Sequence, residues 1–154
     1  MDLILWRHAD AEPGEPDDQR RLTAKGKKQA RRAAEWLHGN LPNSARILVS
    51  PAVRAQQTAS YLQELSHRKV KTVAALAPGA SATEILQAVG WPNAEGCVVV
   101  VGHQPSLGWV ASRVLANNDL PWSIKKAGIW WLQARSEAHG VEVSLRAVVN
   151  PDLV

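Results

Sequence analysis

Apolar and polar positions alternate along this chain in two periods, one typical of strands and one typical of helices. Residues 97–101 are apolar without interruption, a pattern that predicts a buried strand covered on both faces. A second apolar run lies at residues 3–6, within a predicted strand at residues 2–8 that ends in Arg7-His8. Further strands are predicted at residues 46–49, 69–74, 128–134 and 141–149.

Between these strands, apolar positions recur at the spacing of one helix face. Thr23 and Ser50 are predicted to cap the first two helices at their amino ends, and Gly39 is predicted to end the first. Leu65 is predicted to lie on the buried face of the second helix. The predicted helices cover residues 23–38, 51–65, 81–90 and 105–117.

Strands that alternate with helices need crossover connections, which favour a parallel sheet with helices on both faces. The last two strands flank a short turn at His139-Gly140, so we expect this pair to be antiparallel. The chain has no internal repeat, linker or low-complexity segment. We therefore expect a single domain over residues 1–154, with an α/β fold in which three layers (α/β/α) surround a mostly parallel sheet.

The composition is that of an ordinary globular protein, with 45% hydrophobic and 21% charged residues. No apolar stretch approaches the roughly 20 residues that cross a bilayer, and the amino terminus does not have the form of a secretory signal. Cys97 is the single cysteine and is predicted to be a small buried side chain. These features lead us to expect a cytoplasmic protein with no membrane partner.

The formal net charge is +4, and much of the excess lies on one predicted helix. Such a run is usually a solvated helix face, although attraction to an acidic partner protein or a phosphorylated substrate is an equally good use of it. No nucleic-acid-binding motif accompanies the charge, so nucleic acid is not expected as a partner. The residues of this run are Lys25, Lys27, Lys28, Arg31 and Arg32.

Three strand-to-helix junctions carry side chains that suit an anion. Arg7 and His8 follow the first strand, Arg54 lies in the first turn of the second helix, and His103 follows the strand at residues 97–101. A cation in the first turn of a helix is mildly unfavourable unless an anion lies between it and the helix end. Parallel strands point the same way, so all three junctions open on one edge of the sheet, where α/β folds bind ligands.

Together these four side chains suit phosphoryl transfer. Two arginines can bind phosphate oxygens in bidentate fashion, while one imidazole attacks phosphorus and the other donates to an oxygen. This chemistry needs neither a metal nor a cofactor. A metal site made by His8, Asp10 and Glu12 is disfavoured, because the arginines would repel a cation.

The three junctions contain the segments Arg7-His8-Ala9, residues 50–58 (SPAVRAQQT) and Gly102-His103-Gln104-Pro105. These segments resemble the three signatures of the histidine phosphatase superfamily, and the resemblance runs along essentially the whole chain. The short chain, the residues Leu22-Thr23-Ala24-Lys25-Gly26 and the lack of inserted cap segments resemble the small SixA-type phosphohistidine phosphatase branch.

The resemblance implies a phosphoglycerate mutase-like fold without a cap domain. It implies that His8 accepts the phosphoryl group and that Arg7, Arg54 and His103 hold it. It also suggests that Arg20 lies close to the pocket and contributes to substrate binding.

No carboxylate stands out as a proton donor. Glu84 is explained by a capping box with Ser81, and the acids after His8 are either solvated loop residues or groups that swing over the site. An alkoxide leaving group gains much from such a donor, whereas a phosphorylated imidazole leaves readily, because its ring can be protonated near neutral pH. The loop acids are Asp10, Glu12, Asp17 and Asp18.

We therefore predict a phosphatase that hydrolyses phosphohistidine on a protein through a phosphorylated His8. A small-molecule phosphomonoesterase and a non-catalytic phosphate-binding module are the alternatives. The expected partner is a phosphorylated protein, and we expect the chain to act as a monomer.

Overall fold

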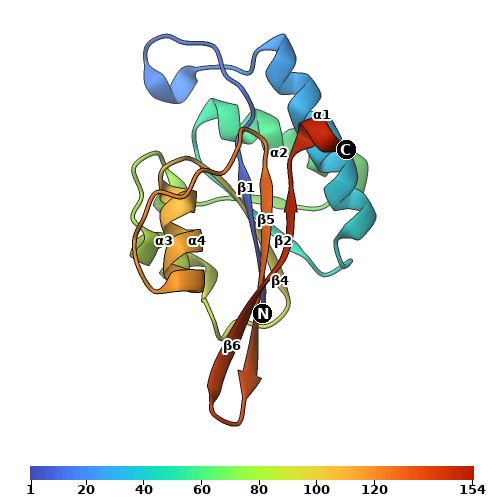
Figure 1. Ribbon diagram of the computed structural model, residues 1–154. Coiled ribbons are helices and arrows are strands. Elements are labelled where there is room, and N and C mark those ends of the chain that lie inside the picture. The colour runs from blue at the N-terminus through green and yellow to red at the C-terminus, as the bar shows by residue number, and fades with distance from the viewer.

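Six strands form one sheet in the order β3-β2-β4-β1-β5-β6 in the computed structural model, which describes all 154 residues (Figure 1). Strands β1 to β4 are mutually parallel, and β5 is antiparallel to both β1 and β6. This confirms the predicted mostly parallel sheet with an antiparallel closing pair. The strands are β1 (Asp2–Arg7), β2 (Arg46–Val49), β3 (Val70–Thr72), β4 (Cys97–Gly102), β5 (Ile129–Glu137) and β6 (Gly140–Val149).

Helices cover both faces of the sheet, with α1 and α2 on one face and α3 and α4 on the other (Figure 1). Short 3-10 helices lie in the connecting segments and at the carboxyl end. The helices are α1 (Ala24–Asn40), α2 (Val53–Ser66), α3 (Ala82–Val89) and α4 (Ser106–Ala116), with η1 (Asp17–Gln19), η2 (Ala74–Leu76) and η3 (Pro151–Leu153). The three layers match the predicted α/β/α sandwich.

The two-residue period of the strands divides the core between the two faces. In β1, Ile4 and Trp6 pack toward α1 and α2, whereas Leu3 and Leu5 pack toward α3 and α4. All six residues of β4 are buried, as predicted for a central strand. With both faces covered, polar side chains that the strands deliver are left at the strand ends.

Four details of the helices and strands differ from the prediction. Helix α2 begins at Val53 and not at Pro51, so Ser50 does not cap it. Helix α1 continues through Gly39 to Asn40, and Leu65 is exposed. Strand β3 is three residues long because the chain turns into η2 after Thr72.

The segment between β1 and α1 folds back over α2 and is fastened at its base. The Thr23 hydroxyl caps α1 by accepting from the amide of Gly26 at 2.9 Å and donates to the Asp10 carboxylate at 2.7 Å. Gly26 allows this close approach, because a Cβ there would clash with the backbone carbonyl oxygen of Asp10. The tip of the segment, η1, is thereby held near the carboxyl edge of the sheet.

No helix in this fold combines the length and the apolar character that crossing a bilayer requires. The β5–β6 hairpin extends away from the layers at the opposite end of the sheet from η1 (Figure 1).

Candidate active site

The carboxyl edge of the sheet brings together side chains from three junctions. His8 follows β1, His103 follows β4, and Arg54 lies in the first turn of α2. The Arg54 Nε atom is 3.3 Å from His8 Nε2, and the ring centroids of His8 and His103 are 5.1 Å apart. All three side chains are buried. Residues separated by up to 95 positions in the sequence thus share one site, as the parallel topology predicts.

His8 has a defined tautomer. Its Nδ1 atom is 2.7 Å from the carbonyl oxygen of Ala9. Because a carbonyl oxygen can only accept, Nδ1 carries the proton and Nε2 keeps its lone pair. The Arg54 Nε–H group donates to that lone pair.

Burial keeps His8 neutral. Desolvation lowers its pKa to about 4, and the charges of Arg54 and Arg7 act in the same direction, while the hydrogen bond to Ala9 opposes them. At neutral pH the ring therefore keeps Nε2 unprotonated, with its lone pair accepting from Arg54, and an unprotonated nitrogen is what a nucleophile requires.

His103 contacts Ser50, the residue that was predicted to cap the second helix. Its Nε2 atom lies 2.7 Å from the Ser50 hydroxyl, which also accepts from the backbone amide of Ala52 at 3.2 Å. The Ser50 hydroxyl can donate to Nε2 or accept from it, because a hydroxyl has one proton and two acceptor lone pairs. The other ring nitrogen of His103, Nδ1, is buried and has no partner. Burial, followed by the neighbouring His8 and Arg54, lowers the pKa of His103 to about 3.

Arg54 and Arg20 share a carboxylate that the prediction did not single out. Arg54 Nη1 donates to the backbone oxygen of Asp17 at 2.7 Å, and Nη2 to its carboxylate at 3.1 Å. Arg20 Nε donates to the other carboxylate oxygen at 3.0 Å. Burial acts to raise the pKa of Asp17, but the hydrogen bonds from both arginines outweigh it and the pKa is lowered. An anion thus does lie beside Arg54, and it belongs to η1.

Arg7 extends along the segment that precedes β5. Its Nη1 atom donates to the carbonyl oxygen of Ile124 at 2.9 Å, and its Nε atom is buried without a partner. Burial lowers the pKa of this guanidinium. Buried donors without partners are uncommon in folded proteins. Arg7 Nε is such a donor on the edge that carries His8, where it is available to an oxygen of an oxyanion. The unpartnered Nδ1 atom of His103 lies on the same edge.

The residues after His8 do not form a metal site. No group of three or more His, Cys, Asp or Glu side chains has the arrangement needed to hold a metal ion. The Asp10 carboxylate pairs with Lys126 at 2.5 Å, and this hydrogen bond, together with that from Thr23, lowers the pKa of Asp10. Glu84 caps α3 in the predicted box with Ser81.

Comparisons with known proteins agree with this geometry. The family model of the histidine phosphatase superfamily (branch 1) matches residues 3–77. An uncharacterized protein of Picosynechococcus is 36% identical over 151 residues, which span 90% of each chain. The phosphohistidine phosphatase SixA homolog of Haemophilus influenzae is 31% identical over 131 residues, spanning 77% of this chain and 80% of that protein.

The fold agrees as well. A structure of the protein histidine phosphatase SixA complexed with tungstate superposes with a TM-score of 0.79 at 23% identity, covering 99% of both chains. The order of the motifs, the shared carboxyl-edge site and the similarity over most of the length point the same way. The chain belongs to the histidine phosphatase superfamily and, within it, to the SixA-type branch.

Proposed function

We propose that this protein removes phosphoryl groups from phosphohistidine on a protein, with His8 as the transient acceptor. The observation that carries the proposal is the neutral His8 ring, whose Nε2 lone pair is directed at Arg54 while Nδ1 is bound to a backbone oxygen. Family membership supports a phosphatase, and phosphohistidine phosphatases are among the named relatives.

In the first step the Nε2 lone pair of His8 attacks phosphorus. The substrate imidazole is protonated on its other nitrogen before transfer. As the new N–P bond to His8 forms, the P–N bond to the substrate breaks, its electron pair goes to the substrate ring, and that ring leaves as a neutral imidazole. Charge on the transferring oxygens is compensated by Arg7, Arg54 and His103. Water then attacks phosphorus, a proton is lost to solvent, and inorganic phosphate departs as His8 regains its lone pair.

The surroundings of the site favour a leaving group that needs no acid from the protein. Asp17 is the carboxylate that contacts Arg54, and both its pKa and that of Asp10 are lowered. Neither carboxyl group holds a proton near pH 7, so neither can protonate a departing alkoxide. A phosphorylated imidazole avoids this requirement, because its leaving nitrogen belongs to a group that is protonated near neutral pH.

The experiment compares wild type and His8→Ala on free phosphohistidine and on a sugar phosphate. We expect the wild type to prefer phosphohistidine strongly and to incorporate label from a ³²P-phosphohistidine donor. The variant should fold but neither turn over nor become labelled. Turnover by His8→Ala close to wild type would refute the acceptor assignment. A strong preference of the wild type for the sugar phosphate would refute the substrate class.

A further inference from the structure

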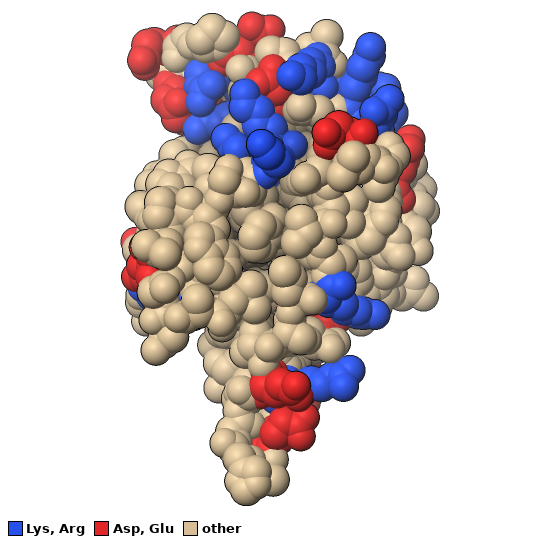
Figure 2. Space-filling view, viewed as in Figure 1, with Lys and Arg blue, Asp and Glu red and all other residues tan.

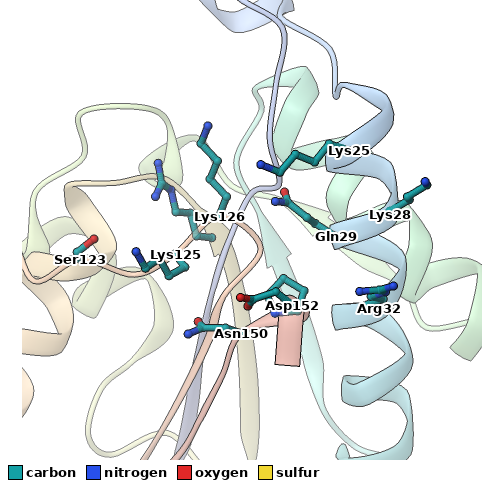
Figure 3. Close-up of a pocket in the computed structure, with 11 residues that line it drawn as sticks. Lys25, Lys28, Gln29, Arg32, Ser123, Lys125, Lys126, Asn150 and Asp152 are labelled. Atoms are coloured by element: carbon teal, nitrogen blue, oxygen red, sulfur yellow. The ribbon is translucent and has the colours of Figure 1, made fainter. Parts of the chain in front are cut away.

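A cavity of about 610 Å³ opens beside Arg7 and is lined by polar and charged side chains. Figure 3 shows side chains of α1 on one wall, the segment with Ser123 on the other, and Asn150 and Asp152 between them. Six lining residues are cations, against the single carboxylate of Asp152. The cations are Arg7, Lys25, Lys28, Arg32, Lys125 and Lys126.

The α1 wall is one stripe of the helix. Lys25, Lys28 and Arg32 recur at i, i+3 and i+7, which places them on a single face. These three side chains are exposed and form no ion pair. Lys27 and Arg31 do not line the cavity. The basic run of α1 is therefore divided, and one part of it faces a concave surface.

The opposite wall is fastened to the candidate active site. Arg7 Nη1 donates to the carbonyl oxygen of Ile124 at 2.9 Å, and the amide of Ala127 donates to the carbonyl oxygen of His8 at 3.2 Å. Lys125, which forms no ion pair, lies between these two anchors. The cavity and His8 are thus held at a fixed separation, with Arg7 common to both.

We propose that this cavity binds acidic side chains that flank the phosphohistidine of the protein substrate, an inference that rests on the proposed function. Lys126 pairs with Asp10, but the other five cations of the cavity form no ion pair. Cations without ion pairs that share a concave surface repel one another and raise the local concentration of anions. Arg7 lines the cavity and directly precedes His8 in the chain, so the cavity adjoins the place where the proposed phosphoryl group meets the protein.

The chemistry of the cavity favours carboxylates over other anions. Four of its six cations are lysines, which act as mobile point charges, whereas bidentate binding of phosphate favours arginine. No aromatic side chain lines the cavity, so nucleic-acid bases would find no stacking surface. Figure 2 shows most of the Lys and Arg side chains in view gathered at one end of the molecule, with Asp and Glu side chains around them.

The test uses two phosphohistidine peptides of equal length. One carries two glutamates on each side of the phosphohistidine, and the other carries glutamines at those positions. The cavity variant carries the double substitution Lys25→Gln, Lys28→Gln. For each protein, the kcat/KM for each peptide is divided by the kcat/KM of the same protein for free phosphohistidine. The matched control, Lys27→Gln with Lys71→Gln, removes the same charge at exposed positions outside the cavity.

We expect the wild type and the control to prefer the glutamate peptide about tenfold at low ionic strength, and the preference to shrink at about 0.5 M salt. The cavity variant should lose most of that preference. Equal rates on the two peptides, or a preference that survives in the cavity variant, would overturn the inference while leaving the proposed function intact.

Two further outcomes are informative. Failure of the wild type to hydrolyse free phosphohistidine would overturn the proposed function, and the inference with it. Hydrolysis of the glutamate peptide can also be measured with a single-stranded oligonucleotide or an unphosphorylated glutamate peptide added as inhibitor. Inhibition by the oligonucleotide alone would assign the cavity to nucleic acid and would also overturn the inference.

Discussion

Asp17→Asn should strengthen the binding of inorganic phosphate. In the free protein the Asp17 carboxylate lies 3.1 Å from Arg54 Nη2 and 3.0 Å from Arg20 Nε, so it occupies guanidinium groups that a phosphate would use. The Asp17 side chain is 55% exposed, and water therefore screens its charge. With an effective dielectric constant of about 60 and charges about 5 Å apart, the repulsion is about 1–2 kcal/mol, or about 5- to 30-fold in affinity.

The assay is the inhibition constant of inorganic phosphate, measured on free phosphohistidine at low and high salt. Asp18→Asn is the matched control, since Asp18 is the neighbouring exposed carboxylate and forms no ion pair. We expect tighter inhibition for Asp17→Asn only, with the difference shrinking as salt rises. An unchanged or weaker inhibition constant would show that Asp17 supports Arg54 in the bound state and does not compete with the anion.

Four other changes test the site and the fold. Ser50→Ala should lower kcat for free phosphohistidine about tenfold with little change in KM, because His103 loses its hydrogen-bond partner. Lowering the pH from 7 to 5 should cost the wild type about 2 kcal/mol of unfolding free energy through His8 alone. The unfolded ring takes up a proton below its ordinary pKa of 6.5, whereas the folded ring stays neutral to about 4, so urea unfolding of His8→Ala should show a smaller loss. Gly26→Ala should lower the free energy of unfolding by about 3 kcal/mol because its Cβ meets a backbone carbonyl. Gly39→Ala, with open space around it in the same helix, should raise it by up to about 1 kcal/mol, and equal effects of the two in urea would contradict the packing argument.

The features that follow from periodicity and topology were predictable from the sequence. The apolar run of β4 predicts a strand with both faces buried, and parallel strands necessarily open their junctions on one edge. Arg54 and His103 therefore could be placed beside His8 without knowledge of any distance.

Side chains with two chemically reasonable uses were not predictable in this way. A serine before a proline is a good helix cap, yet the Ser50 hydroxyl binds His103 because α2 begins three residues later. Asp17 is one of several acids in a polar segment, and only the return of that segment over α2 brings it to Arg54. A regular i, i+3, i+7 spacing within the basic run was the available signal for the cavity wall, but the wall opposite could not be located from α1 alone.

The hydrogen bond from His8 to the Ala9 carbonyl has a consequence for covalent regiochemistry. An imidazole can carry a phosphoryl group on either nitrogen, and the two products are distinct isomers. With Nδ1 committed to a backbone oxygen at 2.7 Å, a phosphoryl group accepted by His8 is directed to Nε2, which gives the tele isomer. One main-chain oxygen, adjacent in sequence, would thus select between two possible intermediates before any substrate arrives.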